Sequence, residues 1–264
     1  MENINFQKSN WDELLDLTTA YFTELGYKND SFFYSNIFDN ESYKIILDDV
    51  PCGFFSLGTS WENEKMLYAF YITPDKRGIS DKILDDLLEK MDIQAAFVVS
   101  NDHHFVSLAF EKMNALGTGF EMQAYNFVYG KPSREAEYSM EHLFEVQPDE
   151  YETMNSLTEG QWDGCFGDPD FFFYAIRHEG KTLGYGAYGK MKYNDKYVDV
   201  GNFTLPEHRQ KGVGRSLIIN ISKLVIKQGL IPAAGCWYGN KNSIMTLKSS
   251  GFIPENRLFK VKFK

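Results

Sequence analysis

The sequence predicts an α+β fold, mixed in helix and strand, divided between two domains of similar size. A length of 264 residues suits one large or two ordinary domains. The polar stretch GKPSREAE (130–137) has the composition of a linker. Hairpin, strand and helix signals follow one another in a similar order on both sides of it. We therefore expect one domain at 1–130, a linker at 131–137 and a second domain at 138–264.

The elements expected in the first domain begin with a helix over 9–26, which starts at the capping sequence SNWDE. A hairpin follows over 43–58, and then come a strand over 65–73 and a helical stretch over 74–91. A buried strand at 95–101, a second helical stretch and a strand at 121–130 complete the domain. Because both strands and helices are amphipathic, each has one face available for a core.

The second domain is expected to repeat this order. A strand at 142–147 leads to a helix at 148–157 that opens on Pro and acidic residues, and a hairpin over 171–191 turns at Glu179-Gly180. The next elements are a strand at 196–205, a helix within 206–229, a buried strand at 231–239, a helix ending at Gly251 and a final strand at 257–263. Four apolar residues fall on one face of the 206–229 helix: Leu217, Ile221, Leu224 and Val225.

Three pairs of residues suggest that the two domains arose by duplication. Gly53 and Gly184 are 131 residues apart, whereas Pro74 and Pro206, like Arg77 and Arg209, are 132 apart. Three anchors at nearly one offset favour an internal repeat. The alternative is a pair of unrelated α+β domains that share a common order of elements.

The composition excludes several classes of protein. No apolar run approaches the ~20 residues of a membrane span, and the N-terminus lacks the basic flank and apolar core of a secretion signal. Cys52, Cys165 and Cys236 are odd in number and contain no CxxC pair, which argues against disulfides and a thiolate zinc site. His103-His104 lacks neighbouring ligands at metal-site spacing. We expect a cytoplasmic protein with no metal and no membrane partner; its oligomeric state stays open.

Charge is distributed unevenly between the two halves. The net charge is −10, which argues against nucleic acid as a partner. Residues 1–130 hold 9 basic and 21 acidic residues, a net charge of −12, whereas residues 131–264 hold 18 and 16, a net charge of +2. The second half therefore tolerates or attracts anions, and the first half repels them.

The strongest local signal for a binding site is RQKGVG (209–214), between the 196–205 strand and the following helix. Glycines let a ligand approach the backbone closely. The first N–H groups of a helix have no internal partners and lie at its positive end, which suits a phosphate. Arg209, Lys211 and Arg215 add positive charge. The spacing matches neither GxGxxG nor GxxxxGK[ST], so the alternative is an ordinary tight turn with solvated basic residues.

This context resembles the GNAT superfamily of acetyl-CoA-dependent N-acetyltransferases. The family signature [QR]xxGx[GA], which follows a strand and a proline, is matched by LPEHRQKGVG (205–214). A second family feature follows in the right order, in NKNS (240–243) leading to GF (251–252). The resemblance covers about residues 140–264. It implies two GNAT-like domains, each a twisted, mostly antiparallel sheet flanked by helices, with acetyl-CoA as the co-substrate.

The resemblance also implies which residues hold CoA. The backbone of 203–205 would pair with the pantetheine arm, and the amides of 210–216 would hold the pyrophosphate. Asn240 and Ser243 would contact the pantetheine; the alternatives are a turn at the strand end for Asn240 and a helix N-cap for Ser243. The full set is Phe203, Thr204, Leu205, Arg209, Gln210, Lys211, Gly212, Val213, Gly214, Arg215, Ser216, Asn240 and Ser243.

The first half carries a degenerate version of this turn, PDKRGISDK (74–82). Ser80 stands where Gly212 stands in the second half, and Lys82 where Gly214 stands. A side chain in a left-handed backbone conformation costs ~1–2 kcal/mol, and nearby Asp75 and Asp81 would repel a polyanion. We predict that the first half no longer binds CoA and that it contributes to the acceptor site instead.

The catalytic groups are less well marked by the sequence. Deprotonating an alkylamine at pH 7 costs ~4.6 kcal/mol, so a base is needed. Asp199 lies close to where relatives often keep an acidic base; the alternative is a solvent-facing strand residue. Many relatives have a tyrosine general acid at the position of Leu247, and here Tyr238 is the substitute candidate, against a core or edge tyrosine. Cys236 is better explained as a small buried apolar residue than as a nucleophile.

The predicted function is therefore transfer of an acetyl group from acetyl-CoA to a primary amine of a small molecule, directly in a ternary complex. The acids and the aromatic ring of the loop 162–170 suit a cationic amine. A non-catalytic acyl-CoA-binding or regulatory module is the first alternative, favoured by Leu247. The second is an aminoacyl-tRNA-dependent peptidoglycan transferase, which also pairs two GNAT-like domains but typically has a helical arm and lacks an intact RxxGxG.

Overall fold

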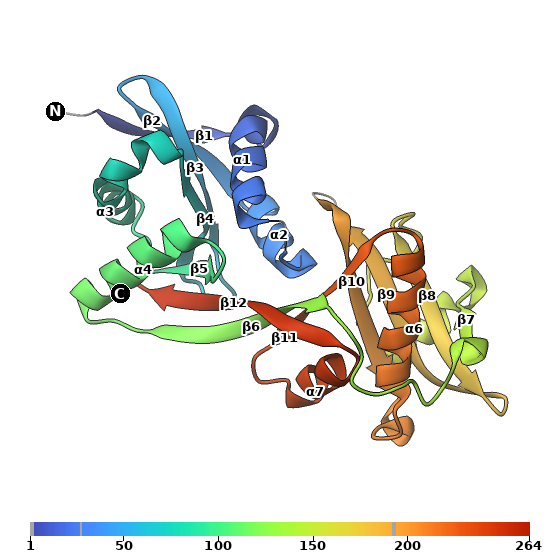
Figure 1. The fold of residues 1–264 in the computed structure, drawn as a ribbon. Helices are drawn as coiled ribbons and strands as arrows, with labels where there is room; N and C mark the ends of the chain where they lie inside the picture. The colour runs from blue at the N-terminus through green and yellow to red at the C-terminus, as the bar shows by residue number, and fades with distance from the viewer. Residues whose placement is uncertain (1–2, 27, 192–193) are drawn as a thin grey trace. The chain divides into compact units, whose positions relative to one another are not determined.

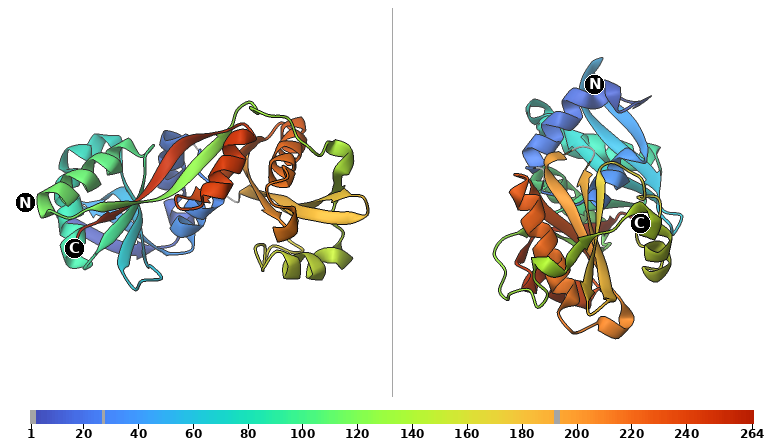
Figure 2. Two further views of the ribbon diagram at one scale, coloured as in Figure 1. Left: turned by 90° about the horizontal axis from the view of Figure 1, so that it is seen from below. Right: turned by 90° about the vertical axis from the view of Figure 1, so that its right-hand side faces the viewer.

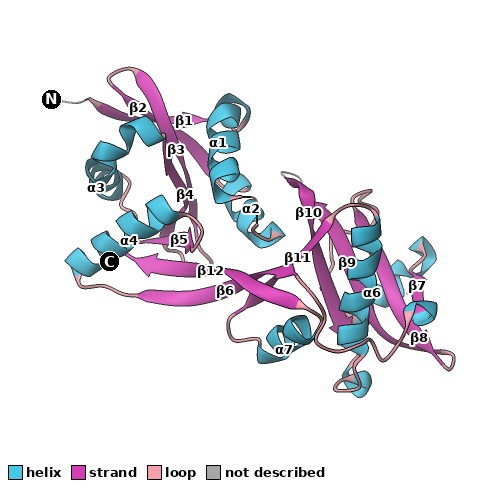
Figure 3. Ribbon diagram, in the orientation of Figure 1, coloured by secondary structure: helices cyan, strands magenta, loops and turns pink. Residues whose placement is uncertain are grey.

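The computed structural model describes residues 3–26, 28–191 and 194–264 (Figure 1). Helices alternate with mostly antiparallel strands along the chain, which confirms the predicted α+β class (Figure 3). The chain divides into two compact units. Unit 1 contains Met1–Tyr27, Phe32–Tyr125 and Asn256–Lys264, and unit 2 contains Lys28–Ser31 and Asn126–Glu255.

The two units differ from the predicted domains in three segments, the first of which is 126–130, expected in the first domain but part of unit 2. Residues 256–264 were expected in the second domain but lie in unit 1, because the last strand pairs antiparallel with Ala95–Val99. Lys28–Ser31 was expected in the first domain but lies in unit 2, where the Ser31 hydroxyl donates a hydrogen bond to Asp199. Residues 131–137, the predicted linker, form an irregular loop.

Unit 1 is built on a sheet with the strand order β1-β2-β3-β4-β5-β12. Neighbouring strands are antiparallel except for β4 and β5, which are parallel. Two strands pass from one unit to the other, because β6 begins in unit 1 and ends in unit 2, and β12 begins in unit 2 and ends in unit 1. The strands are β1 (Ile4–Ser9), β2 (Glu41–Leu47), β3 (Val50–Thr59), β4 (Lys65–Ile72), β5 (Ala95–Val99), β6 (Phe120–Tyr129) and β12 (Phe252–Lys262).

Helices cover both faces of the unit 1 sheet (Figure 1). Phe55 and Leu67 share one core with Leu87 and Phe105 of the helices on their side of the sheet, whereas Phe54 contacts the ring of Tyr21 on the other side. Alternate residues of a strand point to opposite faces, so adjacent Phe54 and Phe55 serve both cores. The helices are α1 (Leu15–Leu25), α2 (Ser31–Phe38), α3 (Ser80–Lys90) and α4 (His103–Leu116), with 3-10 turns η1 (Asp12–Leu14) and η2 (Pro74–Ile79).

Most predicted elements of unit 1 are present, and two were missed. The helix predicted over 9–26 is η1 followed by α1, which ends at Gly26 in a left-handed conformation with φ 72°. The sequence analysis did not find β1 or α2. β1 is short and largely polar, and α2 is an aromatic-rich segment of eight residues that lacks strong helix formers. Tertiary packing, and not the local sequence, therefore determines that β1 and α2 form.

Unit 2 has the strand order β11-β10-β9-β8-β7, antiparallel except for β10 and β11. The predicted hairpin is confirmed, since Glu179 and Gly180, both with positive φ, connect β8 to β9. The strands are β7 (Leu143–Glu145), β8 (Phe171–His178), β9 (Lys181–Met191), β10 (Asn194–Thr204) and β11 (Ile231–Trp237). The helices are α5 (Tyr151–Leu157), α6 (Val213–Lys227) and α7 (Lys241–Ser249), with 3-10 turns η3 (Met140–His142), η4 (Pro148–Glu150) and η5 (Pro206–His208).

α5 and α6 lie on opposite faces of the unit 2 sheet (Figure 2). On the α6 face, a Cβ on Gly186 would lie 2.6 Å from Ile221, so glycine there lets the helix approach the strand closely. On the α5 face, Trp162, Phe173 and Tyr185 form a buried aromatic cluster. Within the described residues, no helix combines the length and apolarity needed to cross a membrane.

Candidate active site

Strands β10 and β11 of unit 2 pair for only three residues. Tyr197–Asp199 lies opposite Ile231–Ala233 in parallel register, and no further pair of these two strands follows in the described part of the chain. Residues 200–204 and 234–237 therefore do not hydrogen-bond to each other across the gap between the strands. Such an opening offers backbone N–H and C=O groups that an amide-rich ligand can use as a strand would.

The chain leaves β10 through a turn whose N–H groups are unused. Gln210 and Gly212 have left-handed conformations, with φ 61° and 77°, and α6 begins at Val213. Among the described residues, the backbone N–H groups of 210–215 donate no hydrogen bond; the first to do so is that of Ser216, 2.9 Å from the Gly212 oxygen. Unpaired amides at the positive end of a long helix form a site for an anion such as phosphate.

Gly214 is needed for close packing of this turn on the strand. A Cβ there would lie 2.8 Å from the Asn202 amide nitrogen and 3.0 Å from the Thr204 hydroxyl, so both side chains would have to shift to admit it. Val213 beside it is buried. The start of α6 is therefore pressed against the end of β10, where the gap begins.

The three predicted basic residues surround the turn. The Arg209 Nε donates to the Thr204 oxygen at 3.3 Å, and its guanidinium lies 5.8 Å from the centre of the Phe203 ring. Lys211 Nζ donates to the Glu207 oxygen at 3.0 Å. Arg215 forms an ion pair with Glu137. The structure thus brings 203–215 together as one cationic surface at the end of the gap.

Glu137 of the predicted linker lies directly against the turn. A Cβ on Gly212 would collide with the Glu137 carboxylate, which also pairs with Arg215. The sequence analysis missed this residue, because an acid in a polar linker carries no signal of its own. Its carboxylate occupies space that an anion bound at the turn requires, so the two compete.

We therefore expect Glu137→Gln to raise the affinity for acetyl-CoA by about 1.4- to fivefold, the range set by the ~0.2–1 kcal/mol of an exposed ion pair. Titration calorimetry at low and high salt measures this change, and the gain should shrink at high salt. Glu135→Gln is the matched control, since Glu135 contacts Arg215 only through its backbone oxygen. An unchanged affinity in Glu137→Gln would contradict the competition.

Ser216 and Leu205 fit their predicted roles less well. The Ser216 N–H donates to the Gly212 oxygen. The Ser216 hydroxyl donates to the same oxygen at 2.9 Å and accepts from the Tyr138 N–H at 3.1 Å. The Leu205 N–H donates to the Leu183 oxygen at 3.2 Å. Ser216 is fully engaged within the protein, so we remove it from the proposed phosphate donors. The Leu205 oxygen already accepts from the His208 N–H at 2.9 Å, so a ligand can use it only as a second donor to the same oxygen.

Asn240 and Ser243 lie together at the start of α7. The Asn240 side-chain oxygen accepts from the Ser243 N–H at 3.1 Å, so Asn240 is the N-cap and Ser243 the third helical residue. The alternative that made Ser243 the N-cap is therefore wrong, because the cap lies three residues earlier. Capping uses the Asn240 oxygen and leaves its amide nitrogen available for another contact.

Asp199 stands at the last paired position of β10, where the gap begins. The Ser31 hydroxyl donates to its carboxylate. Burial raises the pKa of Asp199, outweighing the opposite effect of the Ser31 hydroxyl and the nearby backbone N–H groups of Ser31 and Gly235. A carboxyl group with a raised pKa accepts a proton more readily, which suits a general base. The alternative of a solvent-facing residue is wrong.

The remaining candidates lie on or near β11. Tyr238 follows the strand and is half exposed, so it is not a core tyrosine, whereas the alternative of an edge tyrosine stays open. Leu247 and Cys236 are buried; burial raises the pKa of the Cys236 thiol, which disfavours a nucleophile. In the loop 162–170, Trp162 packs into the α5-side cluster and lies 4.0 Å from the position of a Cβ on Gly201 of β10. Its ring thus borders the gap.

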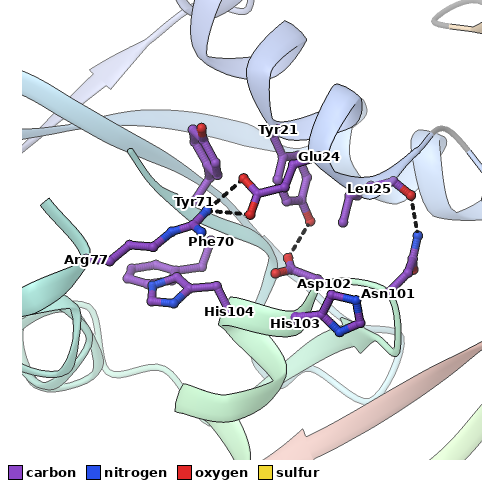
Figure 4. Close-up of a pocket in the computed structure, with 10 residues that line it drawn as sticks. All are labelled: Tyr21, Glu24, Leu25, Phe70, Tyr71, Arg77, Asn101, Asp102, His103 and His104. Carbon is purple, nitrogen blue, oxygen red and sulfur yellow. Dashed lines mark hydrogen bonds and ion pairs between the residues drawn. The ribbon is translucent and has the colours of Figure 1, made fainter. Parts of the chain in front are cut away.

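Unit 1 contains the counterpart of this turn, beside which side chains that interact with one another line a pocket (Figure 4). Arg77 Nε donates to the Ile72 oxygen at 3.3 Å, as Arg209 does to Thr204, but its guanidinium also binds both carboxylate oxygens of Glu24 at 2.6 and 2.7 Å. Ser80, the counterpart of Gly212, is buried and lies 2.9 Å from the His104 ring. Among the described residues, no group of three or more His, Cys, Asp or Glu is arranged to hold a metal ion.

Other matched contacts support the duplication. A Cβ on Gly53 would collide with the Tyr71 oxygen, and one on Gly184 would lie 2.7 Å from the Phe203 oxygen. The helices that follow β5 and β11, α4 and α7, also have similar N-caps. The Asp102 carboxylate accepts from the Phe105 N–H, and the Asn240 side-chain oxygen accepts from the Ser243 N–H. The two units thus repeat specific contacts as well as an order of elements.

Asp102 gives unit 1 a pH-dependent stability. It accepts from the Tyr21 hydroxyl at 2.9 Å, and burial raises its pKa to about 6 (Figure 4). The folded state favours the protonated form of Asp102. Its contribution to the free energy of unfolding is therefore fully present below the pKa of the unfolded state and is lost as the pH rises through about 6. Relative to Asp102→Asn, the wild type should lose about 2 kcal/mol between pH 4 and 7.

Urea unfolding of both proteins across this range measures the difference. Asp16→Asn, which removes an exposed carboxylate from α1, is the control and should follow the wild type at every pH. A constant difference between Asp102→Asn and the wild type would mean that Asp102 keeps its charge when folded.

Comparison with protein-family models identifies both units. Residues 10–130 match the model described as an acetyltransferase (GNAT) domain, and residues 136–252 match that of the acetyltransferase (GNAT) family. The chain belongs to the GNAT acetyltransferase family and carries two of its domains in tandem. GNAT proteins use acyl-CoA as a co-substrate, and the chain is accordingly an acyltransferase.

Solved structures share this tandem fold at low sequence identity. A GNAT-family acetyltransferase from Colwellia psychrerythraea has a TM-score of 0.79 at 16% identity, with 99% of this chain and 100% of that one covered. A tandem GNAT protein from the clavulanic acid biosynthesis pathway has a TM-score of 0.64 at 15% identity, with 99% of each chain covered. A putative acetyltransferase from Pyrococcus horikoshii has a TM-score of 0.53 at 11% identity, with 98% and 93% covered. No match is found among curated protein sequences.

Proposed function

We propose that unit 2 transfers an acetyl group from acetyl-CoA to a primary amine of a small cationic molecule, directly within a ternary complex. The observation that carries this proposal is the turn at 210–215, whose unused N–H groups and three basic side chains adjoin the β10–β11 gap. A phosphate at the turn and an amide-rich arm in the gap match the chemistry of CoA.

The proposed CoA contacts follow from this arrangement. The N–H groups of 210–215, with Arg209, Lys211 and Arg215, bind the pyrophosphate. The backbone of 203–205 and the side chains of Asn240 and Ser243 bind the pantetheine arm. The acetyl thioester then lies in the gap near Asp199, because that residue stands where the two strands separate.

The proposed reaction needs one base and one acid. The acceptor's ammonium group gives up one proton to Asp199, and the resulting amine attacks the thioester carbonyl carbon. The carbon–sulfur bond breaks, the nitrogen gives up a second proton, and the departing thiolate takes one, giving an amide and free CoA. Burial, which raises the pKa of Asp199, supports this residue as the base for the first proton transfer. Tyr238, half exposed at the end of β11, is our candidate for the second.

The test combines binding and turnover. Titration calorimetry should show that acetyl-CoA binds, and release of free thiol should depend on an added primary amine. Free thiol formed without amine, or an ester product from an alcohol acceptor, would contradict amine acetylation. Comparing acetyl-CoA with longer acyl-CoA thioesters tests the preference for acetyl.

A non-catalytic acyl-CoA-binding module remains the second candidate, and one observation favours it. Leu247 is buried where many relatives have a catalytic tyrosine. Such a module binds acetyl-CoA as tightly as an enzyme does but releases no thiol with any amine. Tyr238→Phe distinguishes the two further, because it lowers turnover only if the chain is an enzyme.

We propose that unit 1 does not bind CoA, since Arg77, Glu24, Ser80 and His104 occupy its turn with one another. All three cysteines are free, which fits the reducing cytoplasm that we propose as the site of the reaction.

A further inference from the structure

Lys28–Ser31 lies early in the sequence but belongs to unit 2, to which three contacts tie it. Lys28 forms an ion pair with Glu255 at 2.7 Å, and the Ser31 hydroxyl donates to Asp199. Asp30 is buried, and the Asn126 amide, oriented with its nitrogen toward Asp30, lies 3.1 Å from each carboxylate oxygen. A segment held at three of its four residues is well positioned for a specific role.

The segment reaches the β10–β11 gap. Gly235 is exposed on β11, two residues beyond Ala233, the last residue paired with β10. A Cβ on Gly235 would collide with the Asp30 carboxylate, so only glycine lets Asp30 lie there. The Gly235 N–H also lowers the pKa of Asp199 through a hydrogen bond to its carboxylate. Two carboxylates, one from β10 and one from the early segment, therefore border Gly235 where the strands separate.

Asn29 adds an unmet hydrogen-bond requirement at the same place. It is fully buried, and one of its amide atoms lies 3.2 Å from the Asn126 amide oxygen. When Asn126 is turned in this way, Asn29 must be turned with it, so that its nitrogen donates to the Asn126 oxygen and its carbonyl oxygen takes the place of the Nδ2 atom. In the described structure the atom at this position is buried without a partner. A buried acceptor of this kind needs a hydrogen-bond donor, and the neighbouring Asp30 carboxylate favours a donor that is cationic.

We propose that Lys28–Ser31 forms the acceptor-recognition part of the unit 2 active site, in which Asp30 and the Asn29 carbonyl oxygen bind the ammonium group of a cationic amine. This inference rests on the proposed function. Asp30 binds the ammonium form, and Asp199 beside it takes the proton that must leave before attack. Ser31 is a positioning residue that holds Asp199. On the β10 side, the ring of Trp162 near Gly201 provides an aromatic surface for the cation.

The proposal predicts a change in acceptor selectivity. Steady-state thiol release is measured with saturating acetyl-CoA and three probes: butylamine and 1,4-diaminobutane, which are cationic at pH 7, and aniline, which is neutral. In Asp30→Asn, the KM for the two cationic amines should rise about 10- to 100-fold, the size expected when a charge-assisted hydrogen bond is lost. The KM for aniline and the acetyl-CoA affinity should stay within about twofold.

Two further variants separate recognition from folding. Gly235→Ala keeps every charge but forces the Asp30 carboxylate away, and it should raise the same two KM values. Asp16→Asn removes one exposed negative charge from α1 and should change none. Acetyl-CoA affinity by calorimetry reports whether each variant has kept the unit 2 fold.

Each outcome decides between the two proposals. A wild type that binds no acetyl-CoA, or releases no thiol with any amine, contradicts the proposed function and this inference together. A wild type that releases thiol, with Asp30→Asn unchanged toward the cationic amines, overturns the inference alone. An equal KM increase for aniline in Asp30→Asn also overturns it, because that marks a general loss of site geometry. A selective increase for the cationic amines in both Asp30→Asn and Gly235→Ala supports it.

Discussion

Gly212→Asp is expected to lower acetyl-CoA affinity by more than 100-fold while the chain stays folded. Gly212 has φ 77° and precedes the unused N–H groups at the start of α6. An aspartate there places a carboxylate among the amides that the pyrophosphate needs, and it repels the phosphates. The same carboxylate suits a helix N-terminus, and Asp tolerates a left-handed backbone better than most residues, so the fold should survive. Titration calorimetry measures the affinity.

Gly214→Glu should have the same effect on affinity, with an added cost in stability because the side chains of Asn202 and Thr204 would have to shift to admit it. The matched control is Gly78→Asp in the corresponding turn of unit 1, where a Cβ meets nothing within 4 Å. It should bind acetyl-CoA as the wild type does. Near-normal affinity in a folded Gly212→Asp protein would exclude this turn as the phosphate site, and a loss in Gly78→Asp would implicate unit 1.

Asp199→Asn is expected to lower kcat by about 10²- to 10⁴-fold, with little change in acetyl-CoA affinity. An amide cannot take the proton that the acceptor must lose, but it fills the same space and still accepts from Ser31. Because burial raises the pKa of Asp199, the wild-type rate should fall on the acid side at a pH above the usual carboxyl range. The variant should lack this acid limb. Stopped-flow or steady-state thiol release across pH measures both.

Ser31→Ala is the matched control for this residue, since it removes the hydrogen bond and keeps the carboxylate. It should lower kcat far less than Asp199→Asn does. Acceptors with a lower pKa need less help in losing a proton, so their rates should fall less in Asp199→Asn. If Asp199→Asn keeps the wild-type turnover and pH profile, proton removal is assigned to water or to Asp30.

The turn and its helix were predictable because their signals are local. Gly212 and Gly214 stand next to Arg209 and Lys211 in one short stretch, and each marks a backbone feature that a side chain would spoil. The degenerate unit 1 turn was predictable for the same reason, since Ser80 replaces a glycine. The spacing alone did not show that Ser216 is used within the helix, because that depends on contacts with Tyr138.

The acceptor side of the candidate site was not predictable from the sequence. Ser31 meets Asp199 across 168 residues, and the Arg257 N–H meets the Ser100 hydroxyl across 157. Such pairings depend on how the whole chain is threaded, and neither composition nor periodicity records them. Asn29-Asp30-Ser31 has the composition of an ordinary turn. The role of Glu137 likewise could not be predicted, because it depends on the position of its carboxylate against Gly212.

The exchange of segments between the units has a consequence for the order of folding during synthesis. While the first half emerges from the ribosome, β5 has β4 on one side and an open edge on the other, because β12 is made last. An unpaired edge is a template for wrong pairing. Closing unit 1 requires β12 to pair with β5, for example Leu258 with Val99, and such long-range pairing is slow. We expect that neither unit reaches its final state until the whole chain is available.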